Sequence, residues 1–270
     1  NDNLFQWAFK KWIVSMVACA TIDEQANHSV LIITGKQGTG KTTWLLNLLP
    51  KEVFSDYVYS GKINPGSRDS TIQLSERILI NMDELASYTK GQIDAFKELI
   101  TKDKITERLA YGTFTENYIR RASFVGSANH NEILMDVTGN RRFLVFEALN
   151  IDFQHCVNLD KVYSQAKTML DSGFKHYFDL IDIAKIEENN IQYKQTNIEE
   201  EYLDKHFRIP TMDELSNAKT MNASEILEYL KFRITGPNYF NAIQLGKLLK
   251  SKGFQTKKVK GINKYLVMIN

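Results

Sequence analysis

Hydrophobic residues along the chain follow two different spacings, and each spacing predicts a different kind of element. Apolar residues three or four positions apart predict amphipathic helices over residues 4–20 and 92–102. Short apolar runs rich in β-branched residues predict strands that are buried on both faces. Four such runs lie at residues 29–34, 77–82, 122–128 and 143–146. Strands that alternate with helices predict an α/β fold with a doubly wound, mainly parallel sheet.

The strand pattern fades after about residue 150. Helical spacing continues over residues 159–170, 181–207, 223–232 and 242–252. Two strands are then expected at 254–259 and 264–269, and helices followed by such a hairpin are typical of a winged helix. The interruption at Pro210 predicts a boundary. We therefore expect an α/β core over residues 1–150, a helical connector over 151–210 and a winged-helix-like domain over 211–270.

Charge is distributed unevenly, although the formal net charge is only +2. The last 30 residues contain no acidic residue and seven lysines: Lys247, Lys250, Lys252, Lys257, Lys258, Lys260 and Lys264. Residues 183–204 are acidic by comparison, which suggests two units with different tasks. The tail predicts contacts with duplex DNA, with Lys257, Lys258 and Lys260 as the candidates. A merely solubilising surface is the alternative.

The two cysteines, Cys19 and Cys156, have neither zinc-ligand spacing nor a disulfide pattern. This predicts buried free thiols in a reducing cytosol. No apolar run reaches the roughly 18 residues that a membrane span requires, so we expect a cytoplasmic protein without a membrane partner. The chain starts with Asn1 rather than Met, which suggests a piece of a longer protein.

A phosphate-binding loop is the strongest motif. Residues 35–42 read Gly-Lys-Gln-Gly-Thr-Gly-Lys-Thr, directly after a predicted strand and at the start of a predicted helix. Glycines let backbone N–H groups point at a phosphate, and the helix N-terminus adds a positive dipole. Lys41 would reach the β- and γ-phosphates, and Thr42 would ligate Mg²⁺. The motif predicts ATP and Mg²⁺ as cofactors, held by Gly35, Gln37, Gly38, Thr39, Gly40, Lys41, Thr42 and Thr43.

An acidic pair follows the second predicted strand. Asp83 would hold Mg²⁺ through water, and Glu84 would act as the base that polarises the attacking water. The pair is typical of an ATP hydrolase rather than a kinase. Asn81 is a polar interruption of this strand. An Asp N-cap with a solvated Glu is the alternative interpretation.

Three further polar residues complete the candidate catalytic set. Asn129 follows the third strand, where an Asn in AAA-type ATPases orients the lytic water, although such an Asn is also common in turns. Arg141 and Arg142 lie in a predicted turn before the fourth strand. Either arginine could reach the γ-phosphate of a neighbouring subunit and stabilise the transition state. Surface ion pairing is the alternative.

Residues 102–121 read as a basic hairpin with aromatic residues. Such a stretch suits phosphate contacts and base stacking on single-stranded nucleic acid, although a solvated hairpin fits equally well. The candidate contacts are Lys102, Lys104, Arg108 and Tyr111.

The order of these blocks resembles the virulence-associated protein E family, which comprises phage- and island-borne ATPases similar to superfamily 3 helicases. The resemblance covers roughly residues 6–147 and is carried by residues 82–85, 97–101, 108, 111–112, 124–129 and 138–143. It implies a P-loop core of the AAA type, a ring-shaped homo-oligomer and translocation on nucleic acid. Members often carry a primase-like domain upstream, which is possible in a full-length protein but is not assigned to this chain.

Together these features predict a superfamily 3-like helicase or translocase that hydrolyses Mg-ATP and acts on DNA in the replication of a phage or mobile element. Single-stranded DNA would pass the hairpin in the pore, and duplex DNA would bind the tail. Two alternatives remain. One is a nucleotide-switched DNA-binding regulator, and the other is a defence-type signalling ATPase that assembles on a protein partner; neither would unwind DNA.

Overall fold

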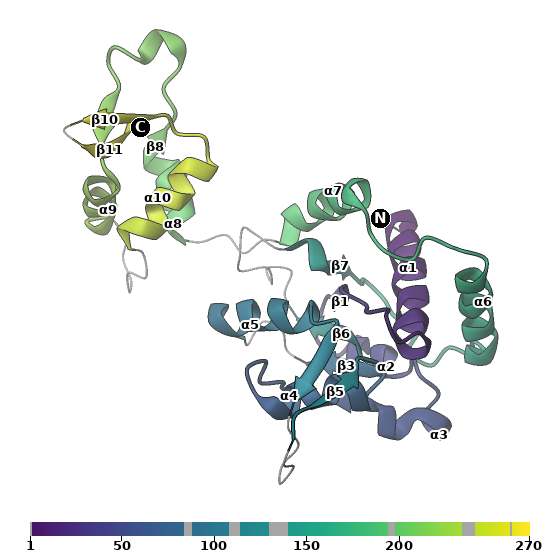
Figure 1. Ribbon diagram of the computed structural model, residues 1–270. Coiled ribbons are helices and arrows are strands. Elements are labelled where there is room, and N and C mark those ends of the chain that lie inside the picture. Colours follow the sequence, from purple (N-terminus) through teal and green to yellow (C-terminus); the bar gives the residue numbers. More distant parts are fainter. Residues whose placement is uncertain are drawn as a thin grey trace. The chain divides into compact units, whose positions relative to one another are not determined.

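Five strands form a parallel sheet in the computed structural model (Figure 1). In spatial order they are β2 (Val58–Ser60), β3 (Leu79–Met82), β6 (Ser123–Ala128), β1 (Val30–Thr34) and β7 (Phe143–Glu147). Every pairing within this sheet is parallel. The prediction of a mainly parallel α/β sheet is therefore confirmed. The short strand β2 was not foreseen, because three residues are too few to establish a periodic pattern.

Helices cover both faces of this sheet. They are α1 (Asp2–Thr21), α2 (Lys41–Leu46), α3 (Lys51–Phe54), α4 (Arg68–Glu76), α5 (Lys90–Ile100), α6 (Leu159–Asp171) and α7 (Leu180–Asn190). Successive strand residues point to opposite faces. Phe124 of β6 therefore packs with Phe96 of α5, whereas its neighbour Val125 belongs to the core formed with Trp12 of α1 and Leu45 of α2. Burial on both faces explains why the strands read as continuous apolar runs.

The chain divides into two units, residues 1–195 and 196–270. The structure describes residues 2–83, 88–107, 114–129, 140–193, 198–233, 241–259 and 261–270. The unit boundary differs from the predicted limits at 150 and 210. Helices α6 and α7 belong to the first unit, where Ala166 and Ile186 are part of the core beneath the sheet. The expected helical stretch 181–207 is divided between α7 and α8 (Ile198–His206) of the second unit.

An antiparallel hairpin projects from the first unit. Its strands are β4 (Lys104–Glu107) and β5 (Glu116–Ile119), with Lys104 opposite Ile119. The hairpin expected over 102–121 is thus present in these strands. Arg108 and Tyr111 lie outside the described residues.

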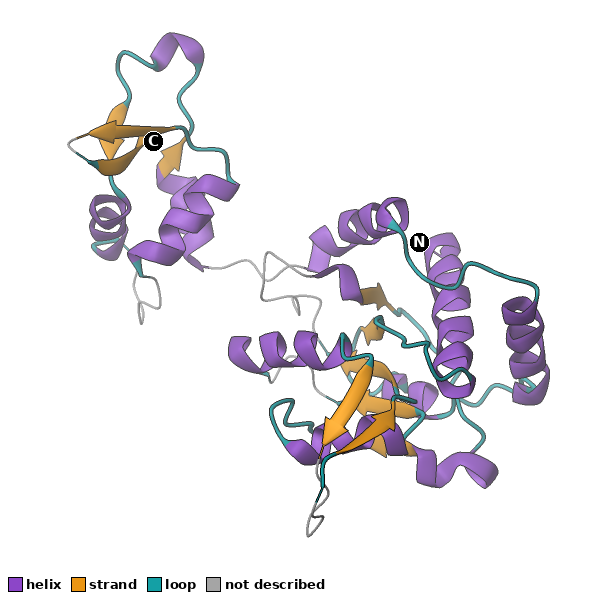
Figure 2. Ribbon diagram, viewed as in Figure 1, coloured by secondary structure: helices purple, strands orange, loops and turns teal. Residues whose placement is uncertain are grey.

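The second unit combines α-helices with a small antiparallel sheet (Figure 2). Its elements are α8, β8 (Phe207–Arg208), β9 (Lys219–Met221), α9 (Ala223–Lys231), α10 (Ala242–Ser251), β10 (Thr256–Val259) and β11 (Ile262–Ile269). Strand β11 pairs with β10, β9 and β8. A separate core, which includes Leu203, Ile226, Leu245 and Val267, holds these elements together.

Short 3-10 helices join several of these elements: η1 (Ser55–Tyr57), η3 (Asn140–Arg142), η4 (Ile191–Tyr193) and η5 (Met212–Glu214).

The two cysteines differ in environment. Cys19 is buried, and its thiol donates to the carbonyl oxygen of Ala122 over 3.7 Å. Burial raises the pKa of this thiol. Cys156 is exposed, so the prediction of a buried thiol is wrong for that residue. Neither cysteine forms a disulfide.

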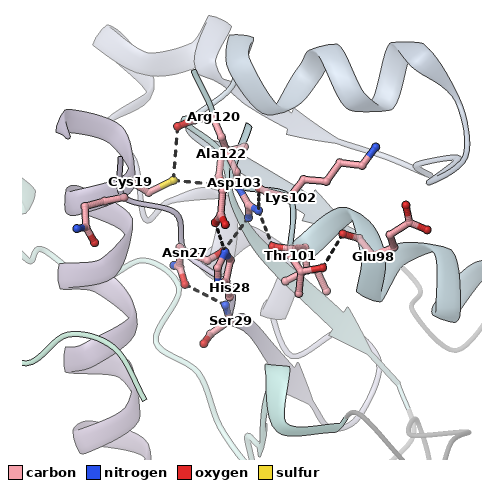
Figure 3. Close-up of polar contacts among 12 residues, drawn as sticks. Cys19, Asn27, His28, Ser29, Glu98, Thr101, Lys102, Asp103, Arg120 and Ala122 are labelled. Carbon is pink, nitrogen blue, oxygen red and sulfur yellow. Dashed lines mark hydrogen bonds and ion pairs between the residues drawn. The ribbon is translucent and has the colours of Figure 1, made fainter. Parts of the chain in front are cut away.

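A buried arginine ties the base of the hairpin to the rest of the first unit (Figure 3). Arg120 is 1% exposed. Its guanidinium donates to the carbonyl oxygens of Asn27 (2.7 Å), Lys102 (2.8 Å) and Ala122 (3.2 Å), and to that of Ile100. These acceptors lie before β1 (Asn27), at or just after the end of α5 (Ile100 and Lys102) and before β6 (Ala122). Burial lowers the pKa of Arg120. One planar side chain therefore satisfies four carbonyls from three segments.

Replacing Arg120 by Lys should destabilise the first unit. A lysine keeps the charge but cannot donate to all four carbonyls, so buried acceptors lose their partners. We expect a loss of about 3 kcal/mol in the free energy of unfolding. Urea unfolding followed by tryptophan fluorescence measures this unit alone, because all three tryptophans lie in it.

The matched control is Arg121→Lys. Arg121 is partly exposed and pairs with Asp23 over 2.6 Å, so this change should cost less than about 1 kcal/mol. Equal losses in the two variants would contradict a special role for Arg120.

Candidate functional site

The glycine-rich loop joins β1 to α2 in a conformation that requires glycine. Gly35, Gly38 and Gly40 have φ angles of 140°, 81° and 84°, which residues with a Cβ rarely adopt. A Cβ on Gly35 would also lie 2.4 Å from the carbonyl oxygen of Ala148. Gly35 is therefore needed both for its backbone angle and for the close approach of Ala148.

Lys41, the first residue of α2, is turned into this loop. Its side chain is buried, and Nζ donates to the carbonyl oxygens of Gly35 (2.8 Å) and Lys36 (2.6 Å). Burial lowers the pKa of Lys41. Both acceptors are neutral, so a bound anion would be the stronger partner for this ammonium group.

Three side-chain oxygens meet beside the loop. Thr42 Oγ1 lies 3.2 Å from Asp83 Oδ1, Ser127 Oγ lies 2.9 Å from the same carboxylate oxygen, and the two hydroxyl oxygens are 3.1 Å apart. The residues come from the start of α2, the end of β3 and β6. In a parallel sheet the carboxyl ends of all strands lie on the same side of the sheet. This explains how residues from three different elements meet. A carboxylate and two hydroxyls are oxygen ligands of the kind that Mg²⁺ prefers.

Ser127 was absent from the sequence-based site. The available signal was a small polar residue near the end of a mainly apolar strand, two positions before Asn129. Asn129 itself follows β6 directly and is exposed at the same edge of the sheet as the loop. Glu84, the predicted base, lies outside the described residues, although it follows Asp83 in the chain.

Asn81 lies on β3, two residues before Asp83, and therefore on the same face of the sheet. It is fully buried, and its amide nitrogen donates to Ser60 Oγ over 3.0 Å. The hydrogen bond to β2 satisfies the amide nitrogen of Asn81, whereas its Oδ1 is buried without a hydrogen-bond partner among the described residues.

Arg141 and Arg142 lie at the amino ends of the strands, whereas the phosphate loop lies at their carboxyl ends. They belong to η3, directly before β7, and Phe143 pairs with Val30 at the start of β1. The loop follows Thr34 at the other end of that strand, roughly 15 Å away at the usual strand rise. Arg141 is exposed and Arg142 is half-buried. Burial lowers the pKa of Arg142, and the neighbouring charge of Arg141 lowers it further.

The turn that carries these arginines is held by α7. Asn190 is fully buried, and its amide nitrogen donates to the carbonyl oxygens of Asn140 (3.1 Å) and Phe143 (2.8 Å). The arginines therefore lie on a well-anchored turn at the start of the buried strand β7.

The basic residues of the hairpin have different environments. Lys104 is exposed and Lys102 is half-buried. Arg120 and Arg121, which end the basic stretch, do not fit the prediction of phosphate contacts. Arg120 is buried among carbonyls, and Arg121 pairs with Asp23.

The lysine-rich tail is also less uniform than its sequence suggests. Lys252 pairs with Glu200 (2.9 Å) and Asp204 (2.7 Å), and Lys264 pairs with Glu225 (3.1 Å). These two lysines neutralise acids of their own unit. The exposed candidates are Lys247 and Lys250 on α10, and Lys257 and Lys258 on β10. Lys260 lies outside the described residues.

Of the helices that the structure describes, none combines the length and hydropathy needed to span a bilayer. The described residues also contain no group of three or more His, Cys, Asp or Glu side chains suited to a metal. The oxygen cluster of Thr42, Asp83 and Ser127 is of a different type, because two of its three members are hydroxyls.

Solved structures similar to this chain include those of the NrS-1 C-terminal region. The apo structure of that region (305-718) is 14% identical, with a TM-score of 0.47, and the match covers 100% of this chain and 76% of that chain. An A-form apo structure of the same region is 15% identical, with a TM-score of 0.45 and coverage of 99% and 75%. No curated protein matches the chain.

A family model described as the virulence-associated protein E-like domain matches residues 1–201. The match includes the glycine-rich loop, Asp83, Ser127, Asn129 and both arginines of η3. Since it spans most of the sequence, the chain belongs to the virulence-associated protein E-like family.

Proposed function

We propose that this chain is a superfamily 3-like motor of the AAA type, which hydrolyses Mg-ATP and acts on DNA in the replication of a phage or mobile element. The observation that carries the proposal is the oxygen cluster of Thr42, Asp83 and Ser127 beside a glycine-rich loop that contains Lys41. Family membership supports the biological setting, because the family comprises phage- and island-borne ATPases.

The residues of the loop fit a nucleoside triphosphate with Mg²⁺. Backbone N–H groups of the loop and of the start of α2 would hold the phosphates. Lys41 would exchange its hydrogen bonds to the carbonyls of Gly35 and Lys36 for contacts with the β- and γ-phosphates. Thr42 and Asp83 would hold the metal, and its positive charge would neutralise the charge that develops on the phosphate oxygens. Glu84 is the proposed base, and Asn129, at the same edge of the sheet, would orient the lytic water.

The position of the arginines supports a shared site. Arg141 and Arg142 lie at the far edge of the sheet from their own loop, so neither reaches it without a large rearrangement. An exposed arginine on an anchored turn suits contact with the γ-phosphate of a neighbouring subunit. The chain would then work as a homo-oligomer, which the family resemblance suggests is a ring.

Two surfaces are the proposed contacts with DNA. The hairpin, with Lys102, Lys104, Arg108 and Tyr111, would line the pore and contact single-stranded DNA. The second unit runs α8, the short strands β8 and β9, the helices α9 and α10, and the β10–β11 hairpin, with β9 beside β11. Two helices followed by a hairpin support the proposal of a winged helix. The exposed lysines of α10 and β10 would contact duplex phosphates.

Replacing Lys41 by Ala should abolish ATP turnover. The change removes the cation of the phosphate loop, and we expect the rate to fall at least about 10²-fold. Lys36→Ala is the matched control, because Lys36 is exposed in the same loop and offers Lys41 only its backbone carbonyl. The measurement is the steady-state rate of phosphate release with and without single-stranded DNA. Normal hydrolysis by Lys41→Ala would refute the site, whereas turnover that DNA does not stimulate would favour the nucleotide-switched regulator.

Active sites shared between subunits should allow two inactive variants to complement each other. A mixture of Lys41→Ala subunits with subunits that carry Arg141→Ala and Arg142→Ala should regain part of the activity, because one kind of interface pairs an intact loop with intact arginines. Wild-type specific activity should also rise with protein concentration. A monomeric preparation with a constant specific rate over a wide concentration range would show that the arginines are structural.

The exposed lysines of β10 should contribute to duplex DNA binding. Replacing Lys257 and Lys258 together by Ala should reduce the slope of log affinity against log salt by about 2, at roughly 0.9 per lost phosphate contact. Basal ATP hydrolysis should not change. The control replaces Lys205 and Lys231 by Ala, which removes the same charge from exposed positions on α8 and α9. Identical salt dependence in the two double variants would refute a specific role for β10.

A further inference from the structure

Ser127 occupies the interior of the site next to the proposed metal ligands. It lies on β6, the strand between β1 and β3, and its side chain is almost completely buried. Val125, two residues earlier, packs in the core on the α1 and α2 face of the sheet, so Ser127 points to that same face. A polar side chain at this depth requires a partner.

The partner of Ser127 is the carboxylate of Asp83. Ser127 Oγ donates to Asp83 Oδ1 over 2.9 Å, and Thr42 Oγ1 donates to the same oxygen over 3.2 Å. Each hydroxyl has one hydrogen. When both hydrogens point at Asp83, the lone pairs of Thr42 and Ser127 face each other across 3.1 Å. The cluster then has more acceptor sites than hydrogens, and a cation or a water held by a cation would relieve this imbalance.

We propose that Ser127 is a positioning residue of the magnesium site. Its hydroxyl holds the Asp83 carboxylate against Thr42, so that both reach the metal of the nucleotide together. This inference rests on the proposed function, since it concerns the same Mg-ATP. It assigns a role to a residue on a third element, β6, which also carries Asn129 at its end.

Removal of this hydroxyl should weaken the binding of Mg²⁺ and leave the binding of the phosphates unchanged. In Ser127→Ala the carboxylate of Asp83 loses the shorter of its two bonds to these hydroxyls and keeps the longer one, to Thr42. The glycine-rich loop and Lys41 do not change. Loss of a group that orients a metal ligand typically costs 10- to 100-fold in metal affinity.

The experiment titrates Mg²⁺ against a fluorescent ATP analogue at fixed concentration and measures binding rather than turnover. Relative to wild type, Ser127→Ala should raise the Mg²⁺ concentration for half-maximal binding about 10- to 100-fold. Affinity for the analogue in EDTA should be the same for both proteins. Thermal unfolding followed by tryptophan fluorescence checks that the variant is folded.

Ser123→Ala is the matched control. Ser123 lies four residues earlier on β6, on the same face, and is fully buried. Its hydroxyl accepts from Asn27 Nδ2 over 3.2 Å, at the amino end of the strand and away from the loop. This variant loses a buried hydroxyl of the same strand, and its Mg²⁺ midpoint should equal that of wild type.

The outcomes separate the inference from the proposed function. If wild type binds the analogue without any dependence on Mg²⁺, or does not bind it, the proposed function fails. If wild type depends on Mg²⁺ and Ser127→Ala has the same midpoint, the role of Ser127 alone is overturned. Equal weakening with Mg²⁺ and in EDTA also overturns it, because Ser127 would then act on the loop rather than on the metal.

Discussion

Parallel pairing of β6 between β1 and β3 is the interaction on which the candidate site depends. Thr42, Asp83 and Ser127 are separated by 41, 44 and 85 positions along the chain, and they meet because the carboxyl ends of these strands share one edge. Packing enforces this register. Residues such as Phe124 and Val125 are buried on opposite faces, so a shift by one residue would turn each toward the wrong core.

The two ends of β6 serve different purposes. At its amino end, the buried guanidinium of Arg120 ties the strand to the base of the hairpin and to the segment before β1 (Figure 3). At its carboxyl end, Ser127 contacts Asp83 and Thr42. In the proposed motor, the hairpin that contacts DNA and the site that holds Mg-ATP would therefore be connected through one buried strand.

The distribution of cations favours a site that is incomplete within one subunit. Lys41 is the basic side chain turned into the phosphate loop, whereas Arg141 and Arg142 lie at the other edge of the sheet. In the proposed mechanism a neighbouring chain supplies the missing positive charge. The lysines of the second unit also fall into two groups: some form ion pairs within the unit, and others are exposed to solvent. Lys252 and Lys264 neutralise acids of their own unit, and Lys257 and Lys258 extend into solvent.

The sequence by itself determined the features that depend on local spacing. The sequence predicted four of the five strands of the parallel sheet, the glycine-rich loop at the end of β1 and the hairpin strands. The spacing of apolar residues indicates which positions are buried, and glycines indicate where the backbone adopts unusual angles. Asp83 was predictable because it directly follows a buried strand.

Only the tertiary structure decided which distant residues meet. Ser127 is a small residue within the third predicted strand, and its partner Thr42 is 85 positions away. Arg120 falls within the predicted basic hairpin over 102–121, yet it is buried because carbonyls from three segments converge on it. The division of 181–207 between two units likewise follows from the separate cores on which its helices pack. Hydrogen bonds and ion pairs of this kind depend on the three-dimensional register of the elements, which no local pattern encodes.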